Sequence, residues 1–275
     1  MSFSSEQIQK ISKEISSKVS GKTLFDEFSR GRYSTDASVY QIKPLGVILP
    51  KDTNDVLNIM DYSQRNSIPL LARGGGSSQC GQTVGESVVL DYSRHQNKIL
   101  ELNVKDKYVW VEPGVVLDHL NEYLKPYGLW FPVDVSTSSR ATIGGMSANN
   151  SCGSRSLYYG NMVHNVLAIE AILDDGSIFT FDQIEKNFLE RKNNQDRLYK
   201  IIDKFIDVRQ KVNNDIKDNW PTTQRRVGGY NIDLIDPNGF NSSNLLVGSE
   251  GTLSLFNKIK LKLSEIPKNK ILGVC

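Results

Sequence analysis

Apolar residues that recur every three or four positions predict helices in four parts of the chain. Between residues 5 and 19, several isoleucines share one helical face. Asp52 can cap a helix that runs to about residue 65, and leucines lie in register between residues 116 and 127. Residues 184–216 are polar with scattered apolar positions, which also indicates helices.

Short apolar runs bounded by proline, glycine or aspartate predict β-strands. These runs cover residues 44–50, 68–72, 88–90, 99–102, 108–111, 245–247 and 253–263. Two further strands, at 163–173 and 177–181, flank Asp174-Asp175-Gly176 and predict a hairpin. Because helices and strands are interleaved along the chain, the pattern predicts an α/β or α+β fold.

The most informative polar stretch, RGGGSSQCGQ at residues 73–82, begins where the strand at 68–72 ends. Three consecutive glycines permit positive φ angles and close approach to a ligand, and successive N–H groups can surround an anion. Two serines add hydroxyl donors. The stretch therefore predicts a pyrophosphate site, although a flexible surface turn can have the same composition.

Two common nucleotide motifs are absent from this stretch. A Walker A loop needs Gly-Lys followed by Ser or Thr, and no such triplet follows the glycines. The GxGxxG fingerprint fails because its sixth position, counted from Gly74, is Gln79. Asp91, at a strand end downstream, is accordingly interpreted as a turn-forming residue rather than a ribose ligand.

A second long stretch, residues 131–154, is rich in glycine, serine, threonine and asparagine. Small residues over such a length suggest a backbone that lies against a large flat ligand, with hydroxyl and amide groups available for hydrogen bonds. A buried loop packed on the core is the alternative. Together with the first glycine loop, this stretch favours the ligand-binding interpretation.

Composition and charge exclude several functional classes. The 275 residues carry a net charge of +2 with acidic and basic residues interleaved, which argues against nucleic-acid binding. No apolar run reaches the ~18 residues of a membrane-spanning helix, and the N-terminus lacks the apolar core of a signal peptide. Cys80, Cys152 and Cys275 form neither a CxxC pair nor a disulfide framework, which fits a reducing cytoplasm.

Candidate catalytic residues are few. None of the histidines has a partner at metal-ligand spacing, so no metal site is predicted. His164 follows the second loop closely and is a catalytic candidate. Arg225, Arg226 and Tyr230 are further candidates, because an arginine fork suits a substrate carboxylate. A structural role is the alternative for all four.

Five motifs in a fixed order resemble a known family. They are RGGGSS at 73–78, PVD at 132–134, ATIGGM at 141–146, NSCGSRS at 150–156 and VGSEGTL at 247–253. In this order they resemble the FAD-binding domain, of the vanillyl-alcohol-oxidase/p-cresol-methylhydroxylase (PCMH/VAO) type, of bacterial FAD-linked dehydrogenases. These include D-lactate, glycolate and D-2-hydroxyglutarate dehydrogenases. The sequence is most similar to the long members fused to a C-terminal iron–sulfur region.

The resemblance implies an α+β fold of two α+β subdomains with FAD between them. It implies an N-terminal helical extension over residues 1–42 and a FAD-binding domain over 43–265, with subdomains at about 43–105 and 106–265. Residues 266–275 would begin a C-terminal substrate domain, so the protein is expected to continue beyond residue 275. The Fe–S cluster and much of the substrate site would lie in that region, outside this sequence.

The family's cofactor contacts carry over to matching positions. They place the pyrophosphate at the first glycine loop, the flavin and ribityl chain along the second loop, and the adenosine end near residues 166 and 250–251. The expected cofactor-binding residues are Arg73, Gly74, Gly75, Gly76, Ser77, Ser78, Gly81, Gln82, Pro132, Val133, Asp134, Thr142, Gly144, Gly145, Ala148, Asn149, Ser151, Gly153, Val166, Glu250 and Gly251. Because Ser77 and Ser78 stand where some relatives carry a flavin-linked histidine, non-covalent FAD is expected.

The resemblance also implies an activity, the oxidation of a small 2-hydroxy acid such as D-lactate by hydride transfer to FAD. Two alternatives stay open: a flavin-binding module without turnover of its own, and a reductase of similar fold that takes hydride from NADPH. The electron acceptor and any assembly into a homo-oligomer are not specified. A cytoplasmic location is expected, with peripheral contact at the inner membrane through the electron acceptor as an option.

Overall fold

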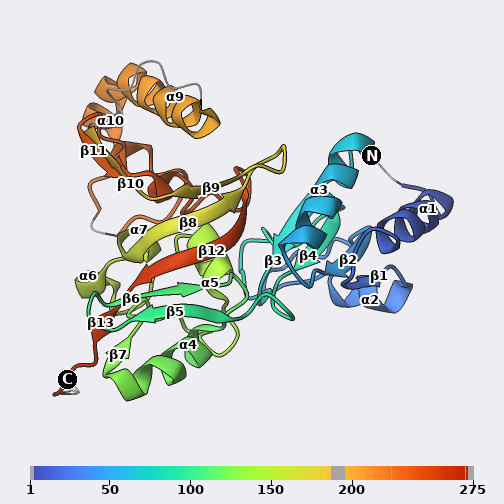
Figure 1. Ribbon diagram of the computed structural model, residues 1–275, viewed down its shortest axis with the longest axis horizontal. Coiled ribbons are helices and arrows are strands. Elements are labelled where there is room, and N and C mark those ends of the chain that lie inside the picture. Colours follow the sequence, from blue (N-terminus) through green and yellow to red (C-terminus); the bar gives the residue numbers. More distant parts are fainter. Residues whose placement is uncertain (1–2, 187–195, 224, 270, 272–275) are drawn as a thin grey trace.

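The computed structural model describes residues 3–186, 196–223, 225–269 and 271. These residues form two α+β units that lie beside each other, each built around its own sheet (Figure 1). The N-terminal unit carries a mostly parallel sheet, and the C-terminal unit carries a larger antiparallel sheet. The expected α+β fold of two subdomains is confirmed.

The first sheet has the order β1-β2-β4-β3. Its strands are β1 (Lys22–Leu24), β2 (Gly46–Leu49), β4 (Val88–Asp91) and β3 (Leu70–Arg73). Strands β2, β4 and β3 run parallel, whereas β1 is antiparallel to β2. Both β2 and β4 are buried along their full length. Their unbroken apolar runs are typical of parallel strands that are covered on both faces.

The first unit also contains three helices, α1 (Ser5–Ser16), α2 (Glu27–Arg32) and α3 (Thr53–Asn66). Asp52 caps α3 by accepting a hydrogen bond from the backbone N–H of Asp55, as its place in the sequence predicts. Ile11 and Ile15 of α1 belong to the same buried cluster as Ile48 of β2. The N-terminal segment, expected as a helical extension over residues 1–42, contributes strand β1 and core residues to the first unit.

The second sheet has the order β5-β6-β12-β8-β9, with every neighbouring pair antiparallel. Its strands are β5 (Ile99–Asn103), β6 (Tyr108–Val111), β12 (Leu255–Lys262), β8 (Val166–Ile172) and β9 (Ile178–Phe181). Strand β12 lies between β6 and β8, so the late part of the chain completes the centre of the sheet. The chain passes from one sheet to the other between β4 and β5, before the expected position near residue 105.

Shorter elements surround the second sheet. They are α4 (Leu117–Leu124), η1 (Lys125–Tyr127), β7 (Leu129–Trp130), α5 (Ile143–Ala148), α6 (Ser156–Tyr159), α7 (Met162–Asn165), β10 (Gln183–Glu185), α9 (Arg197–Lys211), α10 (Asn213–Asn219), η2 (Ile232–Leu234), β11 (Gly239–Asn241), η3 (Ser242–Leu245) and β13 (Ser264–Glu265). Strand β7 pairs with β13, and β10 pairs with β11. Helices α9 and α10 confirm the helices expected within residues 184–216, of which 187–195 lie outside the described residues.

The expected hairpin is confirmed, since β8 and β9 pair across the predicted turn. The strand expected at 245–247 is wrong. Asn241 accepts hydrogen bonds from both the backbone N–H and the hydroxyl of Ser243, and a 3-10 helix begins there. Such local side-chain bonding gives the backbone an alternative to a strand. Leu245, at the end of this short helix, and Leu246 and Val247, in the turn that follows, are buried instead.

Candidate functional site

A cavity of about 410 Å³ lies between the two units. The carboxyl ends of β3 and β4 form one wall, and α5 with the start of β12 forms the other. The lining residues are Ala72 to Cys80, Gln82, Thr83, Tyr92, Pro113, Val135 to Thr137, Ala141, Thr142, Gly144 to Met146, Ala148, Asn149, Ser151, Cys152, Val227, Glu250, Gly251 and Ser254 to Phe256. Residues far apart in the sequence thus share one ligand-sized space.

The first glycine loop presents free backbone donors to this cavity. Within the part of the chain that the structure describes, the N–H groups of Gly75, Gly76 and Ser77 donate to no other protein group. Gly76 has a φ of +62°, the conformation in which glycine has no steric penalty. Consecutive unpaired N–H groups at a turn form an anion-binding nest. The loop can therefore hold a phosphate-bearing ligand through its backbone.

Gly74 and Gly75 have no positive φ angle. Glycine is required at these two positions because other residues approach their Cα atoms closely. A Cβ on Gly74 would lie 2.0 Å from the Thr142 hydroxyl oxygen, and one on Gly75 would lie 2.2 Å from the Arg140 carbonyl oxygen. Gly75 therefore touches the backbone of the second loop, and Gly74 touches the Thr142 side chain. Only glycine fits at both positions, and their contact brings the two loops to one face of the cavity.

Helix α5 extends this wall. The Thr142 hydroxyl accepts a hydrogen bond from the N–H of Gly145 at 3.3 Å and caps the helix. A Cβ on Gly144 would lie 2.6 Å from the Cβ of Pro113, so the helix packs directly on the turn after β6. This packing presents Ala148 and Asn149, at the end of α5, to the cavity.

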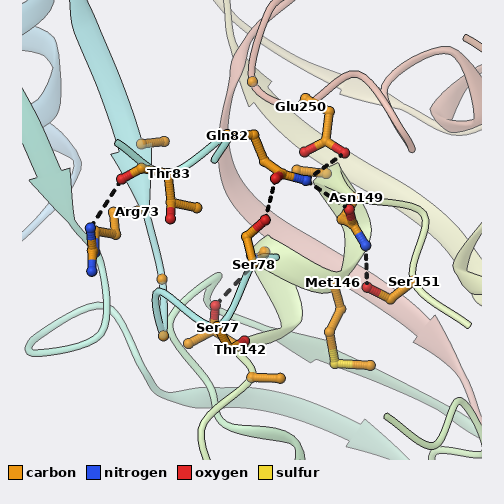
Figure 2. A pocket seen from close by; sticks show the side chains of 18 of the residues that line it. Arg73, Ser77, Ser78, Gln82, Thr83, Thr142, Met146, Asn149, Ser151 and Glu250 are labelled. Atoms are coloured by element: carbon orange, nitrogen blue, oxygen red, sulfur yellow. Dashed lines mark hydrogen bonds between the residues drawn. The ribbon is translucent and has the colours of Figure 1, made fainter. Parts of the chain in front are cut away.

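A hydrogen-bonded network centred on Gln82 connects three cavity loops. Its side-chain nitrogen donates to Asn149 Oδ1 at 3.1 Å and to Glu250 Oε1 at 3.4 Å, and its oxygen accepts from the Ser78 hydroxyl. Asn149 donates in turn to the Ser151 hydroxyl at 3.0 Å. Figure 2 shows Gln82 between these three loops. The amide therefore fixes the relative positions of loops from both units.

Glu250 is the acidic residue of the cavity wall. The residue is exposed overall, yet partial desolvation raises the pKa of its carboxyl group, an effect that the Gln82 hydrogen bond opposes. Its backbone has a φ of +52°, and its N–H donates to the Ala148 carbonyl at 2.9 Å. The turn that carries Glu250 is thus bonded directly to the end of α5.

Two buried hydroxyl groups at the cavity lack a protein partner. Among the described residues, the Tyr92 and Ser254 hydroxyls make no hydrogen bond, and both residues line the cavity. Burial strongly raises the pKa of Tyr92, so its hydroxyl is protonated and can donate. Buried polar groups normally have a partner. These two hydroxyls therefore fit a ligand that carries hydrogen-bonding groups.

Most expected cofactor residues line the cavity, and six do not. The six are Gly81, Pro132, Val133, Asp134, Gly153 and Val166. Val133 and Val166 are buried in the core of the second unit. Asp134 accepts hydrogen bonds from Ser154 and from the N–H of Arg155, and a Cβ on Gly153 would lie 1.3 Å from the Asp134 carbonyl oxygen. These contacts fix the conformation of the second loop, although Asp134 and Gly153 themselves do not line the cavity.

The catalytic candidates do not line the cavity. The Nδ1 atom of His164 accepts a hydrogen bond from the N–H of Asn161. Burial is the main cause that lowers the pKa of the His164 imidazole, and the positive charge of nearby Arg226 adds to it. Arg226 pairs with both carboxylate oxygens of Asp233 at 2.7 and 2.6 Å.

The remaining two candidates are also engaged elsewhere. Arg225 donates to the Gly153 carbonyl at 3.1 Å, and the Tyr230 hydroxyl lies 2.7 Å from the Thr252 hydroxyl oxygen. Each of the four candidates thus has a structural partner.

Sequence reasoning missed several lining residues. Tyr92 directly follows β4, and the carboxyl ends of adjacent parallel strands meet at the same edge of a sheet. That rule points to Tyr92, because the glycine loop follows the neighbouring strand β3. Ser254 and Phe256 come from the start of β12, and no local sequence signal distinguishes them.

Over the described ranges, no helix is both long and apolar enough to cross a membrane. The same residues contain no group of three or more His, Cys, Asp or Glu side chains arranged to hold a metal ion.

Residues 44–182 match the family described as FAD binding domain. The chain therefore belongs to this family, which confirms FAD as the predicted cofactor. The glycine contacts, the unpaired loop N–H groups and the partnerless hydroxyls of the cavity are compatible with such a ligand.

Curated relatives agree with the family. The chain is 37% identical to D-2-hydroxyglutarate dehydrogenase of Haemophilus influenzae over 87% of its length and 24% of the relative. It is 29% identical to glycolate oxidase subunit GlcD of Bacillus subtilis over 96% of its length and 47% of that protein. The chain thus spans about a quarter of the first relative and about half of the second.

Solved structures share the fold. One structure of alkyldihydroxyacetonephosphate synthase superposes with a TM-score of 0.66 at 17% identity and covers 95% of this chain and 44% of that protein. A second gives a TM-score of 0.63 at 18% identity, with 90% of this chain and 38% of that protein covered. At these identities the likeness concerns the fold.

Proposed function

We propose that this chain is the FAD-binding part of a flavin-dependent dehydrogenase that oxidises a small 2-hydroxy acid. The observation that carries the proposal is the cavity itself, which is lined by a loop whose backbone N–H groups donate to no described protein group and by small residues from the other unit. The curated relatives named as D-2-hydroxyglutarate dehydrogenase and glycolate oxidase support the substrate class.

The proposal assigns the ends of the cofactor to parts of the cavity. The N–H groups of Gly75, Gly76 and Ser77 would hold the pyrophosphate, because consecutive amide donors suit its oxygens. The small residues of α5 would lie along the flavin and ribityl chain. Glu250 and Gly251 would lie toward the adenosine end.

When bound, FAD would accept the hydride from the carbon that bears the substrate hydroxyl. The residues of this chain would then bind and orient the cofactor and exclude water from part of its surface. The network around Gln82 supports this role, since it holds loops from both units in one arrangement. The FAD is proposed to be non-covalent, because serines occupy positions 77 and 78.

A flavin-binding module without turnover is the second candidate for this chain by itself. The observation that favours it is the engagement of His164, Arg225, Arg226 and Tyr230 with structural partners. None of the four lines the cavity. In this case, the base and the substrate-binding cation would come from another part of the enzyme.

Anaerobic titration of the FAD-loaded chain distinguishes the two candidates. Bleaching of the visible flavin band by D-2-hydroxyglutarate or D-lactate indicates a complete dehydrogenase site, whereas photoreduction alone indicates a binding module. L-enantiomers serve as the matched control. Bleaching by NADPH but by neither hydroxy acid contradicts the proposal and supports a reductase.

We also propose a cytoplasmic location and an electron acceptor that takes electrons from the flavin. A cytoplasmic location is supported by the wide, unpaired spacing of the cysteines in the sequence. The electron acceptor would take electrons from the reduced flavin, and contact with the inner membrane would occur through that acceptor. Fractionation of native cells, followed by immunodetection in cytosol and membrane, tests this location; recovery outside both fractions contradicts it.

A further inference from the structure

A short segment that precedes the family match lies directly on the first glycine loop. Residues 33–41, here called the strap, end before the match begins at residue 44. A β-bridge between Thr35 and Gln41 closes the strap into a loop. The N–H of Ala37 donates to the Ser78 carbonyl at 3.0 Å. The strap therefore bonds to the backbone of the proposed pyrophosphate loop.

Two more contacts hold the strap and the loop together. The Thr83 hydroxyl donates to Asp36 Oδ2 at 2.9 Å. Gly81 has a φ of +80°, and a Cβ there would lie 2.5 Å from the ring of Tyr40. The strap thus contacts the glycine loop near its middle and at its end.

Arg73 joins the strap to the beginning of the loop. Its guanidinium donates to the carbonyls of Tyr33 at 3.3 Å, Thr35 at 2.8 Å and Thr83 at 3.0 Å. The two terminal nitrogens of Arg73 therefore donate to backbone carbonyls of the strap and of Thr83, which follows the glycine loop. A lysine has one nitrogen and cannot reproduce the planar fork.

The guanidinium also contacts the Tyr33 ring and lies close to Gly76. Its central carbon lies 5.3 Å from the centre of the Tyr33 ring, and the Tyr33 hydroxyl donates to Asp91 Oδ2 at 2.6 Å. A Cβ on Gly76 would lie 2.4 Å from Arg73 Nη2. Gly76 therefore lies against the Arg73 guanidinium, which in turn stacks on Tyr33, a residue bonded to Asp91 at the end of β4.

We propose that the strap is part of the cofactor site and that Arg73 is a positioning residue for the pyrophosphate loop. Arg73 donates to three backbone carbonyls of the strap and of Thr83 and so fixes the glycine loop, including the N–H groups of Gly76 and its neighbours. It does not bind phosphate with its charge. This inference rests on the proposed function, since the loop must hold the pyrophosphate of FAD. It extends the site to residues that the family match does not include.

The test compares FAD with riboflavin, which lacks the pyrophosphate. Dissociation constants of both ligands are measured for the 275-residue apoprotein by quenching of flavin fluorescence, together with the apoprotein melting temperature. The variants are Arg73→Lys, which keeps the charge but loses the fork, and Asp36→Ala, which releases the strap from Thr83. Val39→Ala is the matched control, because Val39 is a strap residue with 96% of its surface exposed.

The expected result for Arg73→Lys is FAD binding weakened on the order of 10- to 100-fold, as is typical when hydrogen bonds of a charged group are lost. Asp36→Ala weakens FAD binding about 3- to 10-fold, since it loses the bond from Thr83 and the bond from the Ser38 N–H within the strap, and Val39→Ala has no effect. Riboflavin binding stays within about twofold of wild type in all three, since the measured loss concerns the pyrophosphate.

Three outcomes overturn the inference. Wild-type FAD affinity in Arg73→Lys indicates that the charge suffices and that Arg73 does not act through the carbonyls. Equal weakening of FAD and riboflavin indicates general damage to the cavity. A wild-type chain that binds neither flavin refutes the proposed function and removes the basis of this inference with it.

Discussion

The side-chain nitrogen of Gln82 donates a hydrogen bond to Glu250 Oε1 at 3.4 Å, although 168 positions separate the two residues in the sequence. Gln82 follows the first glycine loop, and Glu250 precedes the central strand of the second sheet. The bond therefore connects the two units across the cavity. It also places a carboxylate at the cavity wall beside a neutral amide rather than a cation.

Replacement of Glu250 by glutamine changes the pH dependence of stability. Burial raises the pKa of Glu250 in the folded chain above its ordinary 4.5, so the folded state binds the proton more tightly than the unfolded state. The wild type therefore loses stability relative to Glu250→Gln as pH rises through this range. Above it, we expect the variant to melt slightly higher, a small effect because solvent screens the exposed carboxyl, and where the carboxyl is protonated in both states we expect no difference. A variant that melts lower at neutral pH contradicts this prediction.

Replacement of Gly75 by alanine tests the contact between the two loops. The new Cβ would lie 2.2 Å from the Arg140 carbonyl oxygen, so the loops must separate. We expect a loss of about 1–3 kcal/mol in the free energy of unfolding, as is typical of overpacking, and weaker FAD binding. Gly85→Ala is the matched control, because its Cβ would have ordinary contacts of 3.6 Å or more. Equal effects of the two substitutions on denaturant midpoints contradict the loop contact.

Replacement of Tyr92 by phenylalanine separates cofactor binding from apoprotein stability. An unpartnered buried hydroxyl destabilises a protein by about 1–3 kcal/mol, so its removal leaves the apoprotein equally or more stable. If the hydroxyl bonds to FAD, the same variant binds FAD about 5- to 10-fold more weakly. Calorimetry of apoprotein and holoprotein measures both effects. A less stable apoprotein with unchanged FAD affinity indicates that the hydroxyl has a protein role instead.

Replacement of Arg226 by alanine tests the structural role of this former catalytic candidate. Both carboxylate oxygens of the partly buried Asp233 would lose their partner, which costs about 1–3 kcal/mol. The spectrum of bound flavin should not change. Arg225→Ala is the control, because Arg225 is exposed and donates one bond to a carbonyl; its cost should stay below about 1 kcal/mol. An altered flavin spectrum in Arg226→Ala places this residue at the cofactor.

The elements with strong periodicity or unbroken apolar runs were predictable from the sequence. Helix α3 begins at Asp52 because a carboxylate there satisfies a free N–H, and this bond depends only on neighbouring residues. The hairpin of β8 and β9 likewise depends on neighbouring residues, because the two strands pair across one short turn. The 3-10 helix at Ser242 is also local, but the bonds from Ser243 to Asn241 outweigh the apolar pattern that predicted a strand.

The parts that were not predictable depend on distant contacts. Arg73 was expected to bind the cofactor, yet its guanidinium is directed to carbonyls of a segment about 40 residues earlier. The central position of β12 places Ser254 at the cavity, and no property of residues 253–263 themselves specifies that position. Of the three glycines in the first loop, Gly76 has a positive φ, whereas Gly74 and Gly75 serve close packing with the second loop.

The central claim is that the cavity between the two units binds FAD, and a stoichiometry measurement tests it most directly. The purified chain is incubated with FAD, desalted, and analysed for flavin and protein before and after acid precipitation. The account predicts about one FAD per chain after desalting, as in one-site binding, and complete release of the flavin into the acid supernatant. A desalted chain without flavin contradicts FAD binding, and flavin retained in the acid pellet contradicts non-covalent attachment.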